Sequence, residues 1–537
     1  MKIVHYLLLA IAILCVACNA EKQTSENQRP NIFFALADDI SYPHMGAYGM
    51  DWIKTPAFDR VADEGLLFTN AYTPNSKCSP SRASILTGRN SWQLEAGANH
   101  IVDWPEKYKT FTDALSAAGY HVGYTGRGYD PRVNGKQTSI GGKAYNQLRH
   151  ETPTSHMSNI DYAANFEAFL QEREENQPYF FWYSASEAHR RYEFKSGATL
   201  GGKDPSHIEE VPAFWPDNDT VRHDMLDYAF EIEYFDQQLA RMIERIETME
   251  ELDNTIIIVT ADNGMPSPRI KGQAYEISTH MPLAIMWGNG IKNPGRTIED
   301  FVNFIDFAPT FIELAEANAE EAGMFPITGK SLTGIFYTEK AGKTGLGHDY
   351  VLLGKERHDV GRPNDVGYPI RGLVKDNYLY LHNFEPDRWP AGNPETGYTN
   401  TDASPTKTVI LNDRRSGEEM QHWQLCFGKR PREELYDIKN DFYNVNNLAD
   451  DPQYAELKQQ MKEELFAKLA EEGDPRMSGN GQVFEEYPYA RDNSLNFYPR
   501  FMRGDTTLLW RWVDSTDVEW DMVDSIRSSG NYEFDAL

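Results

Sequence analysis

Cysteine is scarce in this chain, with four residues among 537. Cys15 and Cys18 fall in an N-terminal leader segment, which leaves Cys78 and Cys426 for the rest of the protein. Two cysteines do not form a disulfide framework, even in an oxidising compartment. This scarcity predicts a chemical role for Cys78, with a buried inert thiol as the alternative.

Basic residues are also in deficit. Lys and Arg total 52 against 81 Asp and Glu, which gives a formal net charge of −29. The acidic residues are spread along the chain without long blocks. Such a surface disfavours nucleic acid and favours solubility. If the substrate is itself an anion, its site has to gather cations locally.

The apolar run at the N-terminus, within MKIVHYLLLAIAILCVAC, is too short for a convincing membrane span. Together with Lys2 and the small residues near its end, it predicts an export signal over residues 1–18. The segment resembles bacterial lipoprotein signals, which implies a lipid on Cys18 and a polar tether over residues 19–28. The predicted location is the bacterial periplasm or cell surface, with the membrane contacted only through this lipid.

Internal repeats and low-complexity blocks are absent, and two short apolar runs stand out. Residues 31–37 stop at Asp38 and Asp39, and residues 255–261 stop at Asp262 and Asn263. Runs of this kind predict central parallel strands that are covered on both faces by helices, such as 111–119 and 225–249. Both polar pairs then lie at the carboxyl ends of strands, where open α/β sheets place their sites.

The pattern changes near residue 345 to polar, aromatic-rich segments with many Pro, Gly and Asn. We therefore predict a large α/β domain over residues 29–345, with a mixed, mostly parallel sheet flanked by helices. A smaller α+β subdomain is predicted over residues 346–537, with a helix at 451–472. This subdomain is expected to contribute to the substrate pocket.

The segment CSPSRASILTG predicts a helix start, with Ser79 as the N-cap, Pro80 as the first helical residue and Gly88 at the end. Cys78 then lies at a helix N-terminus, where negative charge is favoured. A thiolate nucleophile, as in cysteine hydrolases, is one interpretation. It requires a nearby histidine base and no cluster of oxygen ligands.

The four polar residues at the strand ends are all oxygen donors, which suit Ca²⁺ or Mg²⁺ rather than Zn²⁺. The alternative is a purely structural role, in which these residues cap helices that follow the strands. Taken with the cysteine motif, the metal site is the better interpretation.

These residues carry a family resemblance. PNIFFALADD, CSPSR followed by LTG, TADNG, KGQAYEISTHMPL and ELYDIKNDFYNVNNLA resemble segments of the type I sulfatases of the alkaline-phosphatase superfamily. The resemblance implies an alkaline-phosphatase-like fold and hydrolysis of sulfate esters or N-sulfates. It also implies that a maturation enzyme oxidises Cys78 to formylglycine (3-oxoalanine), whose hydrated aldehyde is the nucleophile.

The resemblance assigns roles to further residues. The ligands of one Ca²⁺ ion would be Asp38, Asp39, Asp262, Asn263 and the modified Cys78. Arg82, Arg127 and Lys271 would stabilise the diol and the sulfate charge. His189 would be the leaving-group acid or a sulfate contact, with help from His280. Two departures leave the acid and base open, because Tyr129 and Ser186 stand where many relatives have histidine.

The C-terminal segments resemble the branch that contains N-sulfoglucosamine sulfohydrolase and bacterial polysaccharide sulfatases, and KGQAYEISTH resembles the iduronate-2-sulfatase branch. The implied substrate is a sulfated carbohydrate. Four residues are candidates for binding a sulfated or uronic sugar: Arg190, His358, Arg362 and Arg371. Trp389 and Tyr378 are candidates for stacking on sugars, with core packing as the alternative.

Two other functions stay open at this stage. One is a phosphonate or phosphodiester hydrolase of the same superfamily. The other is a sulfated-glycan-binding surface lipoprotein with a degenerate site, which is motivated by Tyr129 and Ser186.

Overall fold

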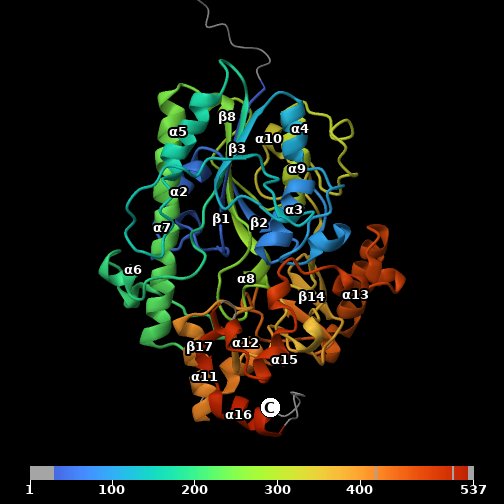
Figure 1. Cartoon of the computed structure of the whole chain (residues 1–537). Coiled ribbons are helices and arrows are strands. Elements are labelled where there is room, and N and C mark those ends of the chain that lie inside the picture. The colour runs from blue at the N-terminus through green and yellow to red at the C-terminus, as the bar shows by residue number, and fades with distance from the viewer. Residues whose placement is uncertain (1–28, 418–419, 511–512, 530–537) are drawn as a thin grey trace, which may run out of the picture.

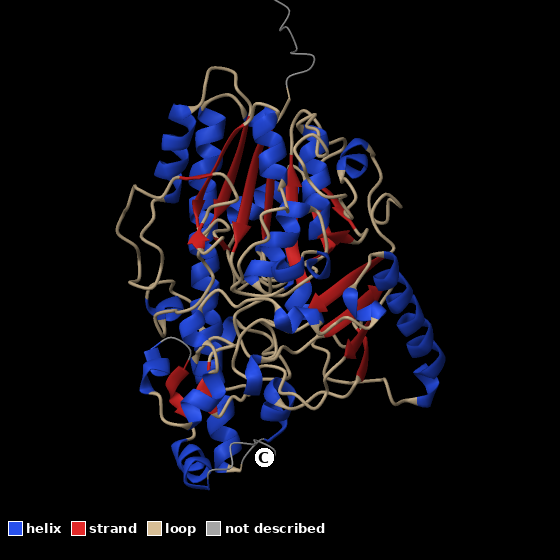
Figure 2. Cartoon of the chain, turned by 45° about the vertical axis from the view of Figure 1, so that its right-hand side comes forward, coloured by secondary structure: helices blue, strands red, loops and turns tan. Residues whose placement is uncertain are grey.

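The computed structural model describes residues 29–417, 420–510 and 513–529, so the predicted leader and tether lie outside the described residues. A nine-stranded sheet forms the centre of the molecule (Figures 1 and 2). Its strands are β1 (Asn31–Ala37), β2 (Leu66–Tyr72), β3 (His121–Gly126), β6 (Lys143–Ala144), β7 (Tyr179–Ser184), β8 (Thr255–Ala261), β9 (His280–Met286), β10 (Arg296–Ile298) and β11 (Val302–Asn303).

The strands follow the order β10-β2-β9-β8-β1-β7-β3-β6, and β11 also pairs with β2. Only β9 runs antiparallel to its neighbours in this sheet. Every residue of β1 and β8 is buried, as expected for strands that are covered on both faces. The predicted mixed, mostly parallel α/β fold is confirmed.

Helices cover both faces of this sheet (Figure 1). One layer contains α2 (Pro56–Asp63), α5 (Tyr162–Glu172) and α7 (Asp219–Thr248), and the other contains α3 (Cys78–Thr87), α4 (Phe111–Ala117) and α9 (Phe307–Leu314). Shorter helices are α6 (Ser196–Thr199), α8 (Glu276–Thr279) and α10 (Thr333–Tyr337). Among the described helices, none combines the length and apolar character needed to cross a membrane.

The C-terminal part contains a separate antiparallel sheet, visible apart from the central one in Figure 2. Its strands, in spatial order, are β12 (Tyr350–Lys355), β13 (Ile370–Lys375), β14 (Tyr378–Asn383) and β16 (Glu433–Asp437). The helix predicted at 451–472 is observed as α13 (Ala455–Glu471), and its Leu465 and Leu469 pack with Leu373 and Tyr380 of the sheet.

Among its described residues, the rest of this part contains a strand pair, β15 (Thr396–Tyr398) and β17 (Val513–Val518), and several α-helices. The helices are α11 (Pro405–Ser416), α12 (Met420–Phe427), α14 (Val483–Glu486), α15 (Phe497–Met502) and α16 (Trp520–Ser529). The division at residue 345 stays a prediction.

The register between β1 and β8 determines where the site lies. The two strands pair in parallel from Asn31 with Thr255 to Ala37 with Ala261. Asp38 directly follows β1 and Asp262 directly follows β8. The two residues therefore lie side by side at the carboxyl ends of these strands.

Arg371, predicted to bind substrate, lies instead in the interior of the C-terminal part. Its guanidinium is fully buried and forms ion pairs with Asp474 (2.7 Å) and Glu356 (2.7 Å). It also lies over the ring of Trp92, 5.0 Å from its centroid. All of these partners are internal, so Arg371 acts in packing and not in sugar binding.

Arg371→Met is expected to lower the free energy of unfolding by about 3 kcal/mol, because the buried carboxylates of Glu356 and Asp474 lose a cation. The measurement is a urea titration followed by fluorescence. Arg60→Met provides the control, since Arg60 pairs with Glu64 and Glu247 at the surface. This variant should lower the free energy of unfolding by less than about 1 kcal/mol. Equal shifts for the two variants would contradict the structural role of Arg371.

Candidate active site

Three carboxylates and an amide converge where β1 and β8 end. They are fully buried and belong to Asp38, Asp39, Asp262 and Asn263. One oxygen from each of the three carboxylates and the Sγ atom of Cys78 all lie within 4.8 Å of one another. The two strand ends and the cysteine motif, far apart in the sequence, thus form one cluster.

Asn263 completes the cluster in a way that suits a cation. Its Nδ2 donates to Asp39 Oδ1 over 2.5 Å, and its own Oδ1 is buried without a hydrogen-bond partner. Asp39 has a left-handed backbone with φ of 67°, a conformation that costs free energy and is typical of functional sites. Burial raises the pKa of Asp39 to about 7. An oxygen-seeking cation fits here, because it would bind the orphaned amide oxygen and stabilise the crowded carboxylates.

Cys78 is the first residue of α3, with Lys77 as the N-cap. The predicted helix start at Ser79 and Pro80 is therefore late by about two residues, while the predicted end at Gly88 is confirmed by its left-handed φ of 67°. The Sγ atom lies 3.3 Å from Asp38 Oδ1 and 4.0 Å from Asp39 Oδ1. Burial, reinforced by the Asp262 carboxylate, raises the pKa of the Cys78 thiol well above its usual range. Carboxylate neighbours rather than a histidine base speak against a cysteine-hydrolase mechanism.

Arg82 lies one helical turn after Cys78 and faces the same cluster. Its Nε donates to Asp262 Oδ2 (2.8 Å), and its Nη1 donates to the Gly128 carbonyl (2.8 Å) and Ser184 Oγ (2.5 Å). The side chain is only 3% exposed. These bonds fix α3 against the ends of the central strands and place a permanent positive charge beside the carboxylates.

Arg127 reaches the cluster from the loop after β3 and forms an ion pair with Asp38. Gly126, which precedes it, has a φ of 90°, and a Cβ there would lie 1.8 Å from the Ser184 carbonyl oxygen. Only glycine allows this close turn. The side chain of Arg127 is 37% exposed, so one guanidinium contacts both the buried cluster and the space outside it.

Tyr129, one of the two predicted departures, lies in a buried setting near the start of α3. Its hydroxyl lies 3.2 Å from Ser79 Oγ, and its ring packs edge-on against Trp104. Burial raises the pKa of Tyr129 well above its usual range. A tyrosine with a raised pKa is a poor base at neutral pH.

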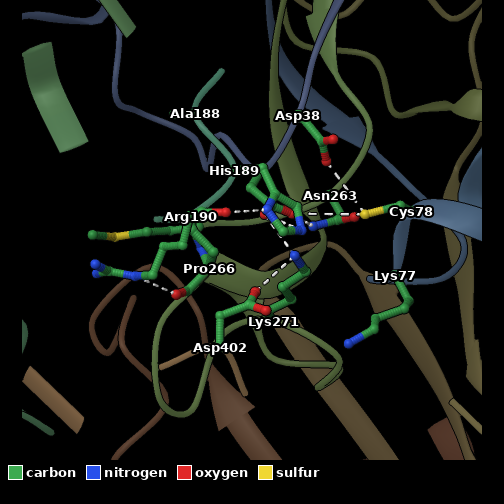
Figure 3. A network of polar contacts seen from close by, with 12 residues as sticks. Asp38, Lys77, Cys78, Ala188, His189, Arg190, Asn263, Pro266, Lys271 and Asp402 are labelled. Atoms are coloured by element: carbon green, nitrogen blue, oxygen red, sulfur yellow. Dashed lines mark hydrogen bonds and ion pairs between the residues drawn. The ribbon is translucent and has the colours of Figure 1, made fainter. Parts of the chain in front are cut away.

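Lys271 links the cluster to the C-terminal part of the chain. Its Nζ lies 2.6 Å from Asp39 Oδ2 and 2.8 Å from Asp402 Oδ2, and Figure 3 shows it directed at Asp402. Asp402 was not predicted from the sequence, because TNTDASP is an ordinary polar coil segment with no distinguishing pattern. Lys77 was also not predicted as a residue near the site. Its side chain points away from Cys78 in Figure 3. It donates to the Asn400 carbonyl (3.0 Å) and forms an ion pair with Asp359 (3.4 Å).

His189 lies beside this group, with one ligand atom each of His189, Asp39 and Asp402 within 4.8 Å of one another. Its Nδ1 is 2.6 Å from the Arg190 carbonyl, which can only accept, so Nδ1 carries the proton. The other nitrogen, Nε2, then faces Asp39 Oδ2 at 3.9 Å. Burial, with Lys271 nearby, lowers the pKa of His189 well below its usual value.

Two other predicted site residues hold the surrounding structure. The ring of His280 stacks between Tyr42 (3.9 Å between centroids) and Tyr72 (4.6 Å), and its Nδ1 is 2.8 Å from Glu276 Oε1. Arg190 forms two bonds to Asp224, of 2.7 and 2.8 Å, and another to the Pro266 carbonyl. Internal partners therefore occupy Arg190 and the Nδ1 atom of His280, whereas His280 Nε2 is buried without a hydrogen-bond partner.

The two remaining candidates also have internal partners. His358 is 1% exposed, and its Nε2 is 2.9 Å from Asn75 Oδ1. A Cβ added to Gly272 would lie 3.1 Å from His358 Nδ1, so this ring packs beside the loop that holds Lys271. Arg362 donates to the carbonyls of Trp389 (2.6 Å) and Pro390 (2.7 Å). Neither side chain is directed to the cluster at Cys78 by these bonds.

A cavity of about 480 Å³ opens over Cys78. Its wall includes Arg82, Arg127 and Tyr129, together with His100 and, from the C-terminal part, Arg491. The volume is within the range of small-ligand sites in proteins. Positive side chains line much of it, which is the local collection of cations that an anionic substrate of this acidic protein requires.

The chain belongs to the sulfatase family, because the family model named Sulfatase matches residues 30–317. It is therefore a sulfuric ester hydrolase with the alkaline-phosphatase-like fold of that family.

Two relatives cover nearly the whole chain. An ulvan-active sulfatase of Formosa agariphila is 26% identical over 487 residues, which is 86% of this chain and 87% of the relative. Human N-sulphoglucosamine sulphohydrolase is 26% identical over 491 residues, 85% of this chain and 93% of the relative. A solved structure in complex with D-glucosamine-2-N,6-O-disulfate has a TM-score of 0.56 and 19% identity over 86% of this chain and all of that chain.

Proposed function

We propose that this protein removes sulfate groups from a sulfated carbohydrate, with residue 78 as formylglycine and one Ca²⁺ ion beside it. The observation that carries the proposal is the 3.3 Å approach of Cys78 to Asp38 within a buried cluster of oxygen donors. The family membership and the cation-lined cavity over Cys78 support it.

The donor set fits calcium by its chemistry. Among the described residues, the group at Cys78 contains carboxylate oxygens and no histidine, and one buried amide oxygen, Asn263 Oδ1, lacks a protein partner. When bound, Ca²⁺ supplies positive charge that lowers the pKa of a coordinated oxygen nucleophile and stabilises charge on sulfate oxygens. The residues that would hold it are Asp38, Asp39, Asp262 and Asn263.

The modified residue 78 would supply the oxygen nucleophile, and the positive side chains would position the sulfate group opposite it. Lys271 pairs with Asp39, whereas Arg127 pairs with Asp38 and also lines the cavity with part of its side chain exposed. Both would hydrogen-bond to sulfate oxygens and stabilise their charge during transfer. Arg82 would hold residue 78 and Asp262 in register.

His189 is the residue that would give a proton to the departing sugar oxygen or nitrogen. The bond from Nδ1–H to the Arg190 carbonyl fixes the ring with Nε2 toward the cluster. Because the pKa of this ring is lowered, Nε2 would first have to take up a proton before it could give one to the leaving group. His280 would act only indirectly, because its ring is confined between two tyrosines.

The substrate class is inferred from the relatives and the cavity. One relative is described as ulvan-active, and another as acting on N-sulphoglucosamine. A cavity of about 480 Å³ accommodates a sugar ring with its sulfate and part of a neighbour.

The test is sulfate release by protein co-produced with a formylglycine-generating enzyme. The panel contains ulvan fragments, N- and O-sulfated glucosamines and sulfated uronates. Release from one class supports the proposal and names the substrate. Turnover of an aryl phosphodiester in place of every sulfate would favour the phosphorus-ester alternative, and saturable glycan binding without any turnover would favour the binding-protein alternative.

Lys271→Ala is expected to lower kcat/KM for sulfate release by about 10²- to 10³-fold, because the site loses a buried donor aimed at developing charge. Steady-state kinetics on the best panel substrate measure this. Lys271→Arg serves as the matched variant and should recover part of the loss, since it keeps the charge but changes the geometry. A change of less than threefold in Lys271→Ala would remove Lys271 from the proposed sulfate site.

We also propose export to the periplasm or cell surface with a lipid on Cys18. The support is the leader sequence alone. Cys18→Ala is expected to move the protein from the membrane fraction to the soluble fraction of cells, as judged by immunoblot. An unchanged distribution between fractions would contradict lipid anchoring.

A further inference from the structure

A second cavity, of about 340 Å³, lies in the C-terminal part of the chain and shares no lining residue with the cavity over Cys78. Its volume is at the lower end of the range for small-ligand sites. Among its lining residues are Arg362, Arg388, Trp389, Asn393 and Lys429.

The backbone at Trp389 is held firmly. Arg362 donates to the carbonyls of Trp389 and Pro390, and Lys355 Nζ donates to the Pro390 carbonyl over 2.9 Å. The indole packs edge-on against Trp423, with ring centroids 5.8 Å apart. Arg362, which was predicted to bind a sulfated or uronic sugar, therefore holds this aromatic wall and also lines the second cavity. A half-buried tryptophan on a fixed backbone offers a rigid surface for a ligand.

Asn393 adds an unused hydrogen-bond donor to this cavity. Its Oδ1 accepts from the Glu395 backbone N–H over 2.9 Å, so the orientation of the amide is set by that bond. Its Nδ2 is buried and has no protein partner. A buried donor without an acceptor destabilises the folded protein. A ligand oxygen that accepts a hydrogen bond from Nδ2 would remove this penalty.

Positive charge gathers at the same place. Arg362, Arg388 and Lys429 line the cavity together with one carboxylate, Asp387, and Arg388 also forms ion pairs with Glu485 and Glu385, which neutralise part of its charge. The ammonium of Lys429 lies 5.4 Å from the centroid of the Trp389 ring. In a chain with a net charge of −29, this local excess of cations indicates an anionic ligand.

We propose that this second cavity binds an anionic sugar residue of the glycan, at a site distinct from the one at Cys78. The indole face suits the C–H face of a pyranose, the Asn393 amide suits a hydroxyl, and the cations suit a sulfate or uronate group. The inference rests on the proposed function, because it assumes a glycan substrate.

One loop connects the two cavities. Asp359 is 3.2 Å from His100, which lines the cavity at Cys78, and Arg362, three residues later, lines the second cavity. Both cavities therefore lie against the same segment of chain. A substrate of several sugars would contact both, whereas a small aryl sulfate would contact only the first.

The experiment compares an aryl sulfate with tetrasaccharides from ulvan and from heparin, which separates algal from glycosaminoglycan sources. Trp389→Ala is expected to raise the KM of the accepted tetrasaccharide roughly tenfold, with kcat changed less than twofold, so its kcat/KM relative to aryl sulfate falls about tenfold. Lys429→Glu, a change at an exposed side chain, should shift KM in the same direction. Trp520→Ala, at an exposed tryptophan outside both cavities, is the matched control.

The same variants made in a Cys78→Ala background allow calorimetric titration of the tetrasaccharides without turnover. Weaker binding in both Trp389→Ala and Lys429→Glu supports the second site. Sulfate release by the unmutated protein together with unchanged KM and Kd in both variants overturns the second site alone. Absence of both sulfate release and tetrasaccharide binding overturns the second site together with the proposed function.

Discussion

Cys78→Ser is expected to lower steady-state sulfate release by about 10³-fold or more. The serine hydroxyl keeps the position at the start of α3, close to Asp38, but serine cannot become a hydrated aldehyde with two oxygens. A sulfate group transferred to serine therefore has no second hydroxyl to expel it. Rates from ion chromatography of free sulfate measure the loss, and intact-protein mass spectrometry should detect sulfate retained on the serine variant.

Cys426→Ser is the control for this experiment. Cys426 is also buried, and its Sγ contacts the Phe214 carbonyl over 3.3 Å, away from the carboxylate cluster. Activity within about threefold of the parent is expected for it, since it lies outside the site. Full turnover by Cys78→Ser would show that residue 78 is not the nucleophile.

Removal of calcium by a chelator is the second change with a large expected effect. Asp38, Asp39 and Asp262 are fully buried and close together. Each already pairs with a cationic side chain, and loss of a bound divalent cation is expected to destabilise the native state by removing further compensating charge. Activity should fall by about 10²-fold or more and return with Ca²⁺. At a free Ca²⁺ concentration 100 to 1,000 times its Kd, the added stability is about 3–4 kcal/mol. Differential scanning calorimetry with and without Ca²⁺ measures this as a rise in Tm.

Asn263→Leu separates metal binding from general stabilisation. It removes the buried Oδ1 that lacks a protein partner while keeping a side chain of similar size, so the Ca²⁺-dependent rise in Tm should shrink. Lys468→Gln, on the exposed face of α13, should leave that rise intact. A Tm that is independent of both chelator and Ca²⁺ in the parent protein would exclude a calcium site in the cluster.

The sequence was sufficient to predict the central strands and their polar ends because the relevant signals are local. A buried apolar run that stops at an acidic residue marks a strand end by itself, and parallel pairing then brings two such ends together. The start of α3 was predicted less well. Ser79 and Pro80 look like a helix start, but the chain is already helical at Cys78, and no side chain caps that end.

The part of the site that depends on long-range packing was not predictable in this way. Asp402 meets Lys271 across 131 residues of sequence, from a coil segment without periodicity. Arg190, Arg362 and Arg371 have the charge that suits a sugar, but only their positions show that internal carboxylates and carbonyls already occupy them. Residue type predicts what a side chain can bind, and tertiary structure decides what it does bind.

The position of Lys271 between Asp39 and Asp402 has a consequence for engineering. Its ammonium group forms one ion pair with Asp39, at the end of a central strand, and another with Asp402, in the segment that follows β15. A single positive charge therefore stabilises carboxylates from both parts of the chain. A chimera that exchanges the C-terminal part to change glycan preference would also alter the electrostatics at Asp39. Such an exchange would have to carry over a carboxylate equivalent to Asp402, because Lys271 pairs with both Asp39 and Asp402.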